Sequence, residues 1–136
     1  MNIDKPDIRV LVVDNWPEYR DLFHVILGDF GYSQIKTAID GPEALAEARE
    51  YKPNLVLMET GIPGYGPTVC SQMRQEDYGK DAAIIGTAHP EYNTVWEAEW
   101  IAAGADDFFV KDMLATGEGR NDLDAKIQKA LAKYQQ

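Results

Sequence analysis

The sequence predicts an α/β fold in which five parallel strands alternate with helices. Short unbroken apolar runs, such as residues 10–13 and 55–58, end on a polar residue and are bounded by turn residues. Such runs are typical of strands that are buried on both faces of a sheet. Segments with apolar residues at helical spacing follow these runs, and this alternation predicts a parallel sheet with helices on both faces.

The boundaries of the elements can be placed in chain order. Pro17 suits a first helical turn, and Gly31 can stop the same helix. Ile35, Thr37 and Ile39 alternate with less apolar residues, which predicts an edge strand. In order, we expect a strand at 10–13, a helix from 17 to near 31, a strand at 35–39, a helix from 41, a strand at 54–58, a helix at 68–76, a strand at 82–86, a helix at 91–103, a strand at 108–110, a loop at 112–121 and a helix at 122–134.

Four strand ends should meet at one edge of this sheet. An edge-like second strand beside central-looking first, third and fourth strands fits the order 2-1-3-4-5. The polar residues that follow the strands are Asp14, Glu59, Thr87 and Lys111. Neighbouring strands lie about 4.8 Å apart, so two acids, a hydroxyl and an ammonium should converge where the strand order reverses. Such a patch suits Mg²⁺ and a phosphoryl group.

Length and composition restrict the class of protein. The 136 residues predict a single domain over 1–136 with its own core. The formal charge of −10 argues against direct nucleic-acid binding and against an anionic membrane surface. The one cysteine excludes an internal disulfide, and no apolar stretch approaches the roughly 20 residues of a membrane span. The amino-terminal residues are too polar for a signal peptide, so we expect a cytoplasmic protein.

Five segments resemble the response-regulator receiver domain, and together they cover nearly the whole chain. The segments are 11–15, 38–45, 53–64, 84–88 and 103–111. The resemblance implies a flavodoxin-like, three-layer α/β/α fold and a role in two-component phosphorelay signalling, in which a histidine kinase phosphorylates an aspartate. It implies the following site: Glu59 at the phospho-acceptor position, Asp14, Asn15 and the carbonyl of Gly61 around the metal, Thr87 and Phe108 as the switch, and Lys111 as the contact to the phosphoryl group.

Three residues depart from the family's pattern: Glu59 replaces the acceptor aspartate, Asn15 replaces a metal-binding acid, and Asp112 replaces a proline. The added methylene moves the Glu59 carboxylate outward by about 1.5 Å, and displacements of about 1 Å can slow positioned reactions about 100-fold. We therefore expect a receiver with a degenerate phosphorylation site, which is not an enzyme and requires no cofactor beyond weak Mg²⁺ binding. Glu59 would either hold the signalling state or leave the switch frozen.

Two other functions stay open. One is a working receiver that accepts a phosphoryl group with Mg²⁺. The other is a small Mg²⁺-dependent phosphohydrolase, which ranks last because the chain lacks a nucleophilic aspartate with a second acid after the first strand, and a cap domain. The expected partners are proteins: a histidine kinase, an output domain or effector, or a second copy bound through the helix at 91–103, the strand at 108–110 and the last helix.

Several side chains also have simpler interpretations. Asn15 precedes an acidic residue by three positions, so it can be a helix N-cap alone. Trp96 and Trp100 are four residues apart on one helix face, which indicates either core packing or a partner surface. Cys70 should lie in the core, and neither histidine has a neighbour in sequence that suggests a metal site.

Overall fold

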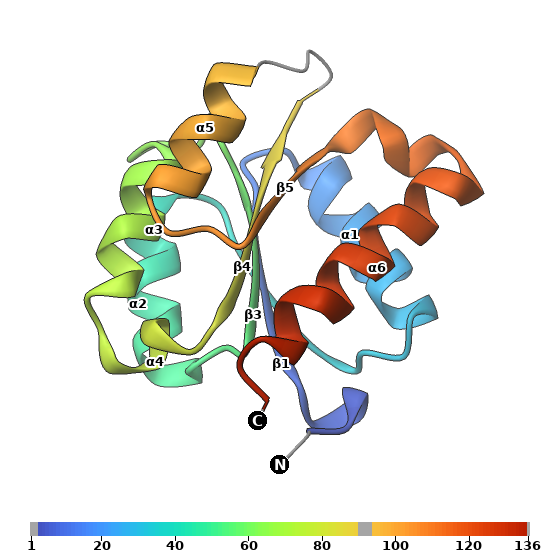
Figure 1. Ribbon diagram of the computed structural model, residues 1–136, viewed down its shortest axis with the longest axis horizontal. Coiled ribbons are helices and arrows are strands. Elements are labelled where there is room, and N and C mark those ends of the chain that lie inside the picture. The colour runs from blue at the N-terminus through green and yellow to red at the C-terminus, as the bar shows by residue number, and fades with distance from the viewer. Residues whose placement is uncertain (1–2, 90–93, 136) are drawn as a thin grey trace.

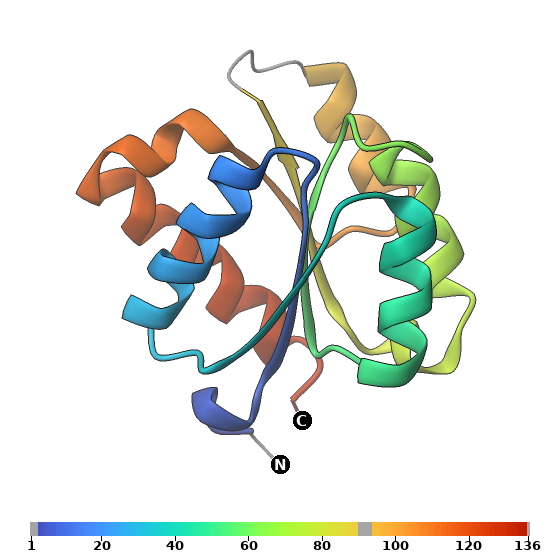
Figure 2. The ribbon, with the colours of Figure 1, turned by 180° about the vertical axis from the view of Figure 1, so that it is seen from behind.

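The computed structural model describes residues 3–89 and 94–135 and shows a parallel sheet between two layers of helices (Figure 1). The five strands follow the order β2-β1-β3-β4-β5, which confirms the predicted topology. The strands are β1 (Arg9–Val13), β2 (Gln34–Ala38), β3 (Leu55–Glu59), β4 (Ala83–Ala88) and β5 (Asp107–Val110). Helices α1 (Pro17–Asp29) and α6 (Gly117–Ala132) cover one face, and α2 (Gly41–Tyr51), α3 (Gly66–Arg74) and α5 (Thr94–Ala102) cover the other (Figures 1 and 2).

Each face of the sheet has a separate core. Along β3 every residue is buried, and alternate residues join opposite clusters. Leu55 and Leu57 pack in the cluster that includes α1 and α6, whereas Val56 and Met58 pack in the cluster that includes α2, α3 and α5. Because helices cover both faces, the central strands need apolar side chains at every position, which accounts for the unbroken runs in the sequence.

The second strand lies at the edge of the sheet, as predicted, but it ends one residue early. Ala38 is its last residue and is fully buried, whereas Ile39 lies beyond the strand and is 46% exposed. The chain leaves the sheet here because Asp40 begins the next helix as its N-cap. The Asp40 carboxylate accepts a hydrogen bond of 2.9 Å from the Glu43 N–H.

The predicted loop before the last helix is wrong. Residues Lys111–Ala115 form a 3₁₀ helix, and α6 begins at Gly117 instead of residue 122. The Thr116 hydroxyl caps this earlier start by accepting a hydrogen bond of 3.0 Å from the Gly119 N–H. Two glycines in the first turn weaken the helical signal in the sequence. A further short helix, α4 (Asp77–Lys80), follows α3 and was not expected.

Trp100 is fully buried and joins α5 to the sheet. A Cβ atom placed on Gly86 would lie 2.2 Å from its ring, and one on Gly66 would lie 2.5 Å from it. The indole Nε1 donates a hydrogen bond of 2.8 Å to the Thr60 hydroxyl, which in turn donates to the Thr87 carbonyl. The interpretation of Trp100 as core packing is confirmed, and its assignment to an exposed partner surface is wrong.

The two ends of the described chain lie together at the amino edge of the strands (Figure 1). The Ile3 N–H donates a hydrogen bond of 3.3 Å to the Gln135 side-chain oxygen. Among the helices formed by residues 3–89 and 94–135, none has both the length and the apolar character needed to cross a bilayer.

Candidate functional site

Charged side chains from three strand ends meet at the carboxyl edge of the sheet. The Lys111 Nζ lies 2.7 Å from Asp14 Oδ2 and 3.2 Å from Glu59 Oε2. The exposed fractions of the three side chains are 0% for Lys111, 1% for Asp14 and 6% for Glu59. The strand order therefore brings together the acids and the lysine that the sequence places at the strand ends.

The Asp14 carboxylate is fully engaged within the protein. Its Oδ1 accepts a hydrogen bond of 2.9 Å from the Trp16 N–H, and its Oδ2 pairs with Lys111. The prediction that Asn15 caps α1 is wrong, because the N-cap position is Trp16 and no side chain caps the helix there. Asn15 is exposed and borders the pocket described below.

The Glu59 carboxylate is held between a backbone amide and the lysine. Its Oε1 accepts a hydrogen bond of 3.1 Å from the His89 N–H. Its Oε2 is in ion-pair contact with Lys111 but has no hydrogen-bonded partner within the described part of the chain. Burial raises the pKa of Glu59 above the 4.5 that is ordinary for glutamate, and Asp14 adds to this effect while Lys111 opposes it. Desolvation thus outweighs the attraction of the ammonium.

The Lys111 ammonium is also covered by an aromatic ring. Its Nζ lies 4.0 Å from the centroid of Tyr19, within the range of a cation–π contact. Burial raises the pKa of the Tyr19 hydroxyl, and the carboxylates of Asp14, Asp112 and Glu59 raise it further. Two carboxylates and one ring therefore enclose the ammonium.

One predicted switch residue, Thr87, lies next to Glu59, and the other, Phe108, lies in the hydrophobic core on the side of the sheet that α2, α3 and α5 cover. Thr87 is buried and pairs with Glu59 in the register of β3 and β4. Phe108 is buried in the same cluster as Trp100. The roles of Thr87 and Phe108 in switching stay predictions.

A pocket of about 300 Å³ opens above Glu59, between the ends of β1, β3 and β4 and the helix α5. The His89 ring stacks on Trp16 with centroids 5.0 Å apart and planes at 17°. The residues that line the pocket are Asn15, Trp16, Glu59, Thr60, Gly61, Tyr65, His89 and Trp96, and we call it the aromatic pocket.

The sequence did not predict three of these aromatic side chains as site residues. A signal was present for two of them, because Trp16 and His89 each lie two positions after a strand-end residue of the site. Tyr65 gave no such signal. It reaches the pocket with a backbone φ of 63°, and its hydroxyl donates a hydrogen bond to the Glu99 carboxylate. Trp96, which the sequence did single out, is half-buried and lines the pocket.

The donor groups fit Mg²⁺ poorly. Mg²⁺ takes oxygen ligands in a near-ideal octahedron, but Lys111 and backbone amides already engage the carboxylates of Asp14 and Glu59. Asn15 offers a neutral amide where the family has a carboxylate. Within residues 3–89 and 94–135, no three His, Cys, Asp or Glu side chains are grouped so as to hold a metal ion. The Lys111 ammonium supplies the positive charge between the two acids.

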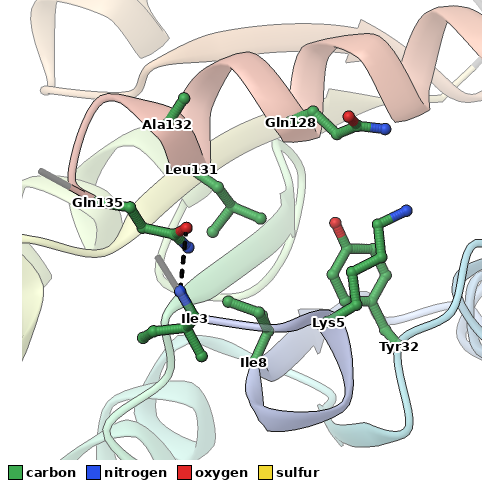
Figure 3. Close-up of a pocket in the computed structure, with 8 residues that line it drawn as sticks. All are labelled: Ile3, Lys5, Ile8, Tyr32, Gln128, Leu131, Ala132 and Gln135. Atoms are coloured by element: carbon green, nitrogen blue, oxygen red, sulfur yellow. Dashed lines mark hydrogen bonds between the residues drawn. The ribbon is translucent and has the colours of Figure 1, made fainter. Parts of the chain in front are cut away.

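A second pocket of about 180 Å³ lies at the opposite, amino edge of the sheet (Figure 3). Ile8 and Leu131 form apolar walls, and the Tyr32 hydroxyl is buried without a hydrogen-bonded partner among the described groups. Burial raises the pKa of Tyr32 to about 12. None of the residues that line this pocket belongs to the cluster around Lys111.

A parallel sheet in the order 2-1-3-4-5, with acids and a lysine at the point where the order reverses, defines a flavodoxin-like signalling module of the receiver type. Comparison with known families agrees. The family model described as the response regulator receiver domain matches residues 10–123. The chain belongs to the response regulator receiver family and is a receiver domain of two-component signalling.

Known relatives include transcriptional regulators that are longer than this chain. The alkaline phosphatase synthesis transcriptional regulatory protein PhoP of Bacillus subtilis is 34% identical over 104 residues, which are 76% of this chain and 42% of PhoP. The probable transcriptional regulator ycf27 of Porphyridium aerugineum is 32% identical over 129 residues, which are 92% of this chain and 48% of the relative. The chain thus spans less than half the length of these two relatives.

Solved structures of response regulators have the same fold. The chemotaxis response regulator CheY4 of Vibrio cholerae superposes with a TM-score of 0.76 at 25% identity, covering 88% of this chain and 98% of that one. A LuxR-family two-component response regulator from Aurantimonas sp. SI85-9A1 gives a TM-score of 0.79 at 25% identity, covering 93% and 86%.

Proposed function

We propose that this receiver domain has a degenerate phosphorylation site and signals through protein–protein contacts without being phosphorylated in the usual way. One observation carries the proposal. The carboxylate at the acceptor position, Glu59, contacts Lys111 at 3.2 Å inside a buried cluster. The lysine that the resemblance assigns to the phosphoryl group is therefore already paired with the side chain that would have to accept that group.

The positions of the Glu59 oxygens support this proposal. One oxygen accepts a hydrogen bond from the His89 N–H and the other faces Lys111. In-line attack on a phosphoryl donor needs a correctly placed carboxylate oxygen, and both oxygens are committed elsewhere. Glu59 carries one negative charge, against about −1.5 to −2 for a phosphate. We infer that it serves as a permanent, weaker partner for Lys111 and fixes the domain in one state.

The expected partners of such a domain are proteins. A histidine kinase, or an output domain like those of the longer relatives, would recognise the surface of the fixed state. The surface formed by α5, β5 and α6 is the proposed contact for a second copy of the chain. Trp96 lies at the border of this surface and stays a candidate for it.

Incubation with acetyl phosphate and Mg²⁺, followed by intact-mass measurement and peptide mapping, tests the proposal. The wild-type protein should gain no phosphoryl group, and the double variant Glu59→Asp/Asn15→Asp should become labelled at residue 59. The variant Glu59→Gln/Asn15→Asp is the matched control, because it restores the metal-binding acid without an acceptor. A stable phosphoryl group on wild-type Glu59 would contradict the proposal.

The alternative is a working, Mg²⁺-dependent response regulator, and membership of the receiver family favours it. Trp16 and Trp96 line the pocket beside Glu59, so their fluorescence should report a metal that binds there. Submillimolar binding in a Mg²⁺ titration would support the alternative. An unchanged signal would support the degenerate site.

A further inference from the structure

We propose that the aromatic pocket binds an organic cation of the guanidinium or ammonium type, such as the side chain of an arginine. The proposal rests on the proposed function in one respect, because it requires that Glu59 stays an unmodified carboxylate. The proposal goes beyond the proposed function by naming the class of ligand that the aromatic pocket would bind.

The walls of the pocket are unusually aromatic. Trp16 and His89 form a stacked pair, and Tyr65 and Trp96 are the other two aromatic side chains among the eight described lining residues. The face of an aromatic ring attracts cations, most strongly for tryptophan, and several rings around one space form a cage that selects cations over neutral groups of the same shape. The hydrogen bond to Glu99 raises the pKa of the Tyr65 hydroxyl to about 12, so the Tyr65 ring is neutral at physiological pH.

The formal charge of the lining is negative. Among the eight described residues that line the pocket, with histidine taken as neutral, the only formal charge is that of Glu59. Its side chain is 6% exposed, its Oε1 accepts the His89 N–H, and its buried Oε2 lies 3.2 Å from the Lys111 Nζ. Lys111 lies beneath the pocket, is 1% exposed and is not part of the lining. A cation entering the pocket would therefore lie near the Glu59 carboxylate and would meet no positively charged side chain among the described lining residues.

Size and donor chemistry narrow the class of ligand. A volume of about 300 Å³ is at the lower end of ligand pockets and suits one long side chain or a small amine. Mg²⁺ is a poor match because it prefers several free oxygen ligands to aromatic rings. An anion would face Glu59 with no cationic side chain among the described lining residues. The net charge of −10 adds a long-range attraction for positively charged groups.

A charged and an uncharged ligand of the same shape test the proposal. The wild-type protein would be titrated with N-acetyl-arginine amide and with N-acetyl-citrulline amide, using calorimetry and the NMR signals of the tryptophan indole N–H groups. Arginine amide should bind on the order of tenfold more tightly than citrulline amide and should shift the signals of Trp16 and Trp96 more than that of Trp100. Its affinity should fall as salt is added.

Variants locate the site. Trp16→Ala and Glu59→Gln should each weaken binding of arginine amide by on the order of tenfold. Ile101→Ala is the matched control, because this side chain is exposed on α5 and does not line the pocket. Trp16 is 47% exposed, so its removal should not unfold the domain.

Two outcomes would overturn the proposal: equal affinity for arginine and citrulline amides, which would mean an uncharged apolar slot, or no shift of the Trp16 and Trp96 signals at millimolar ligand. If binding occurs, a short arginine-containing peptide distinguishes the two sources. Tighter binding of the peptide than of arginine amide indicates a partner protein, and equal binding indicates a small free cation. Phosphoryl labelling of Glu59 in the acetyl phosphate assay would refute the proposed function separately, since the titrations use unlabelled protein.

Discussion

The carboxyl group of Glu59 is subject to two opposing effects. Burial disfavours its ionised form, and the neighbouring Asp14 adds to this cost. The ammonium of Lys111, at 3.2 Å, favours ionisation. The pKa of Glu59 is raised in the folded protein, so the cost of burial is the larger effect.

This balance makes a prediction about pH. Because the pKa of Glu59 is raised on folding, the folded state holds this proton more tightly than the unfolded state does. The contribution of Glu59 to stability is therefore complete below the unfolded pKa and is lost as pH rises through the folded pKa. The free energy of unfolding of Glu59→Gln should therefore increase relative to that of wild type as pH rises from below the ordinary pKa of glutamate through the raised pKa of Glu59.

Urea denaturation of both proteins across a pH series measures the difference between their free energies of unfolding. The contributions of the other titrating groups are common to both proteins and cancel in this difference. A difference between Glu59→Gln and wild type that does not change with pH would show that folding leaves the pKa of Glu59 unaltered.

At the scale of the elements, the contact between α5 and the sheet depends on glycines. Trp100 fits only because Gly86 in β4 and Gly66 in α3 have no Cβ atom, with distances of 2.2 and 2.5 Å from a hypothetical Cβ to its ring. This contact holds α5 against the strand that ends at the site. The position of Trp96 in the pocket follows from it, since the two tryptophans are one helical turn apart.

Gly86→Ala should therefore destabilise the domain by about 1–3 kcal/mol through overpacking. Gly28→Ala is the control, because a Cβ on Gly28 in α1 meets nothing within 4 Å and should be neutral or stabilising. In the background of Trp100→Leu, Gly86→Ala should lower the free energy of unfolding by less, because the indole ring that the new Cβ atom would contact is absent. Chemical denaturation measures all four values. An equal cost of Gly86→Ala in both backgrounds would refute the contact.

The sequence was a good guide to elements with a strong apolar pattern and a poor guide where local capping decides. The apolar runs predicted β1 and β3 with boundaries that lie within one residue of those in the structure. The start of α6 was missed because Gly117 and Gly119 suggest a loop, whereas the Thr116 cap and tight packing of Gly119 against Met113 favour a helix. The short α4 has no apolar period long enough to detect.

At the scale of the whole molecule, one ion pair joins distant parts of the chain. Asp14 and Lys111 are separated by 97 positions in sequence and lie 2.7 Å apart across the carboxyl edge. Because β3 lies between β1 and β4 in the sheet, the cluster around Lys111 ties together strands from the beginning, middle and end of the fold.

Lys111→Met should destabilise the domain by about 3–5 kcal/mol, because it leaves the carboxylates of Asp14 and Glu59 buried together without their cation. Lys133→Met is the control: the Lys133 side chain is 64% exposed, and its partner Asp106 keeps the ion pair with Arg74, so the loss should be less than about 1 kcal/mol. Thermal and urea unfolding measure both values. If Lys111→Met costs no more than Lys133→Met, the buried cluster does not hold the sheet edge together.

Also at the scale of the whole molecule, part of the site could be predicted from the sequence. Strand order follows from apolar patterning, and it brings Asp14, Glu59 and Lys111 together without knowledge of any side-chain contact. The pairing of each oxygen did not follow, because it depends on backbone amides such as that of His89 and on side-chain conformation. Three members of the aromatic lining, Trp16, Tyr65 and His89, were missed for the same reason, since they lie in separate loops.

The hydrogen bond between Ile3 and Gln135 places both ends of the described chain at the edge of the sheet opposite the carboxyl ends of the strands. A strand of five residues spans about 17 Å, so a protein segment tethered at either end would start roughly that far from the aromatic pocket. Such a segment could not sense the pocket by touching its rim unless it folded back along the helices. A change at the pocket would instead have to reach a tethered segment through the strands of the sheet or through the helices that cover it.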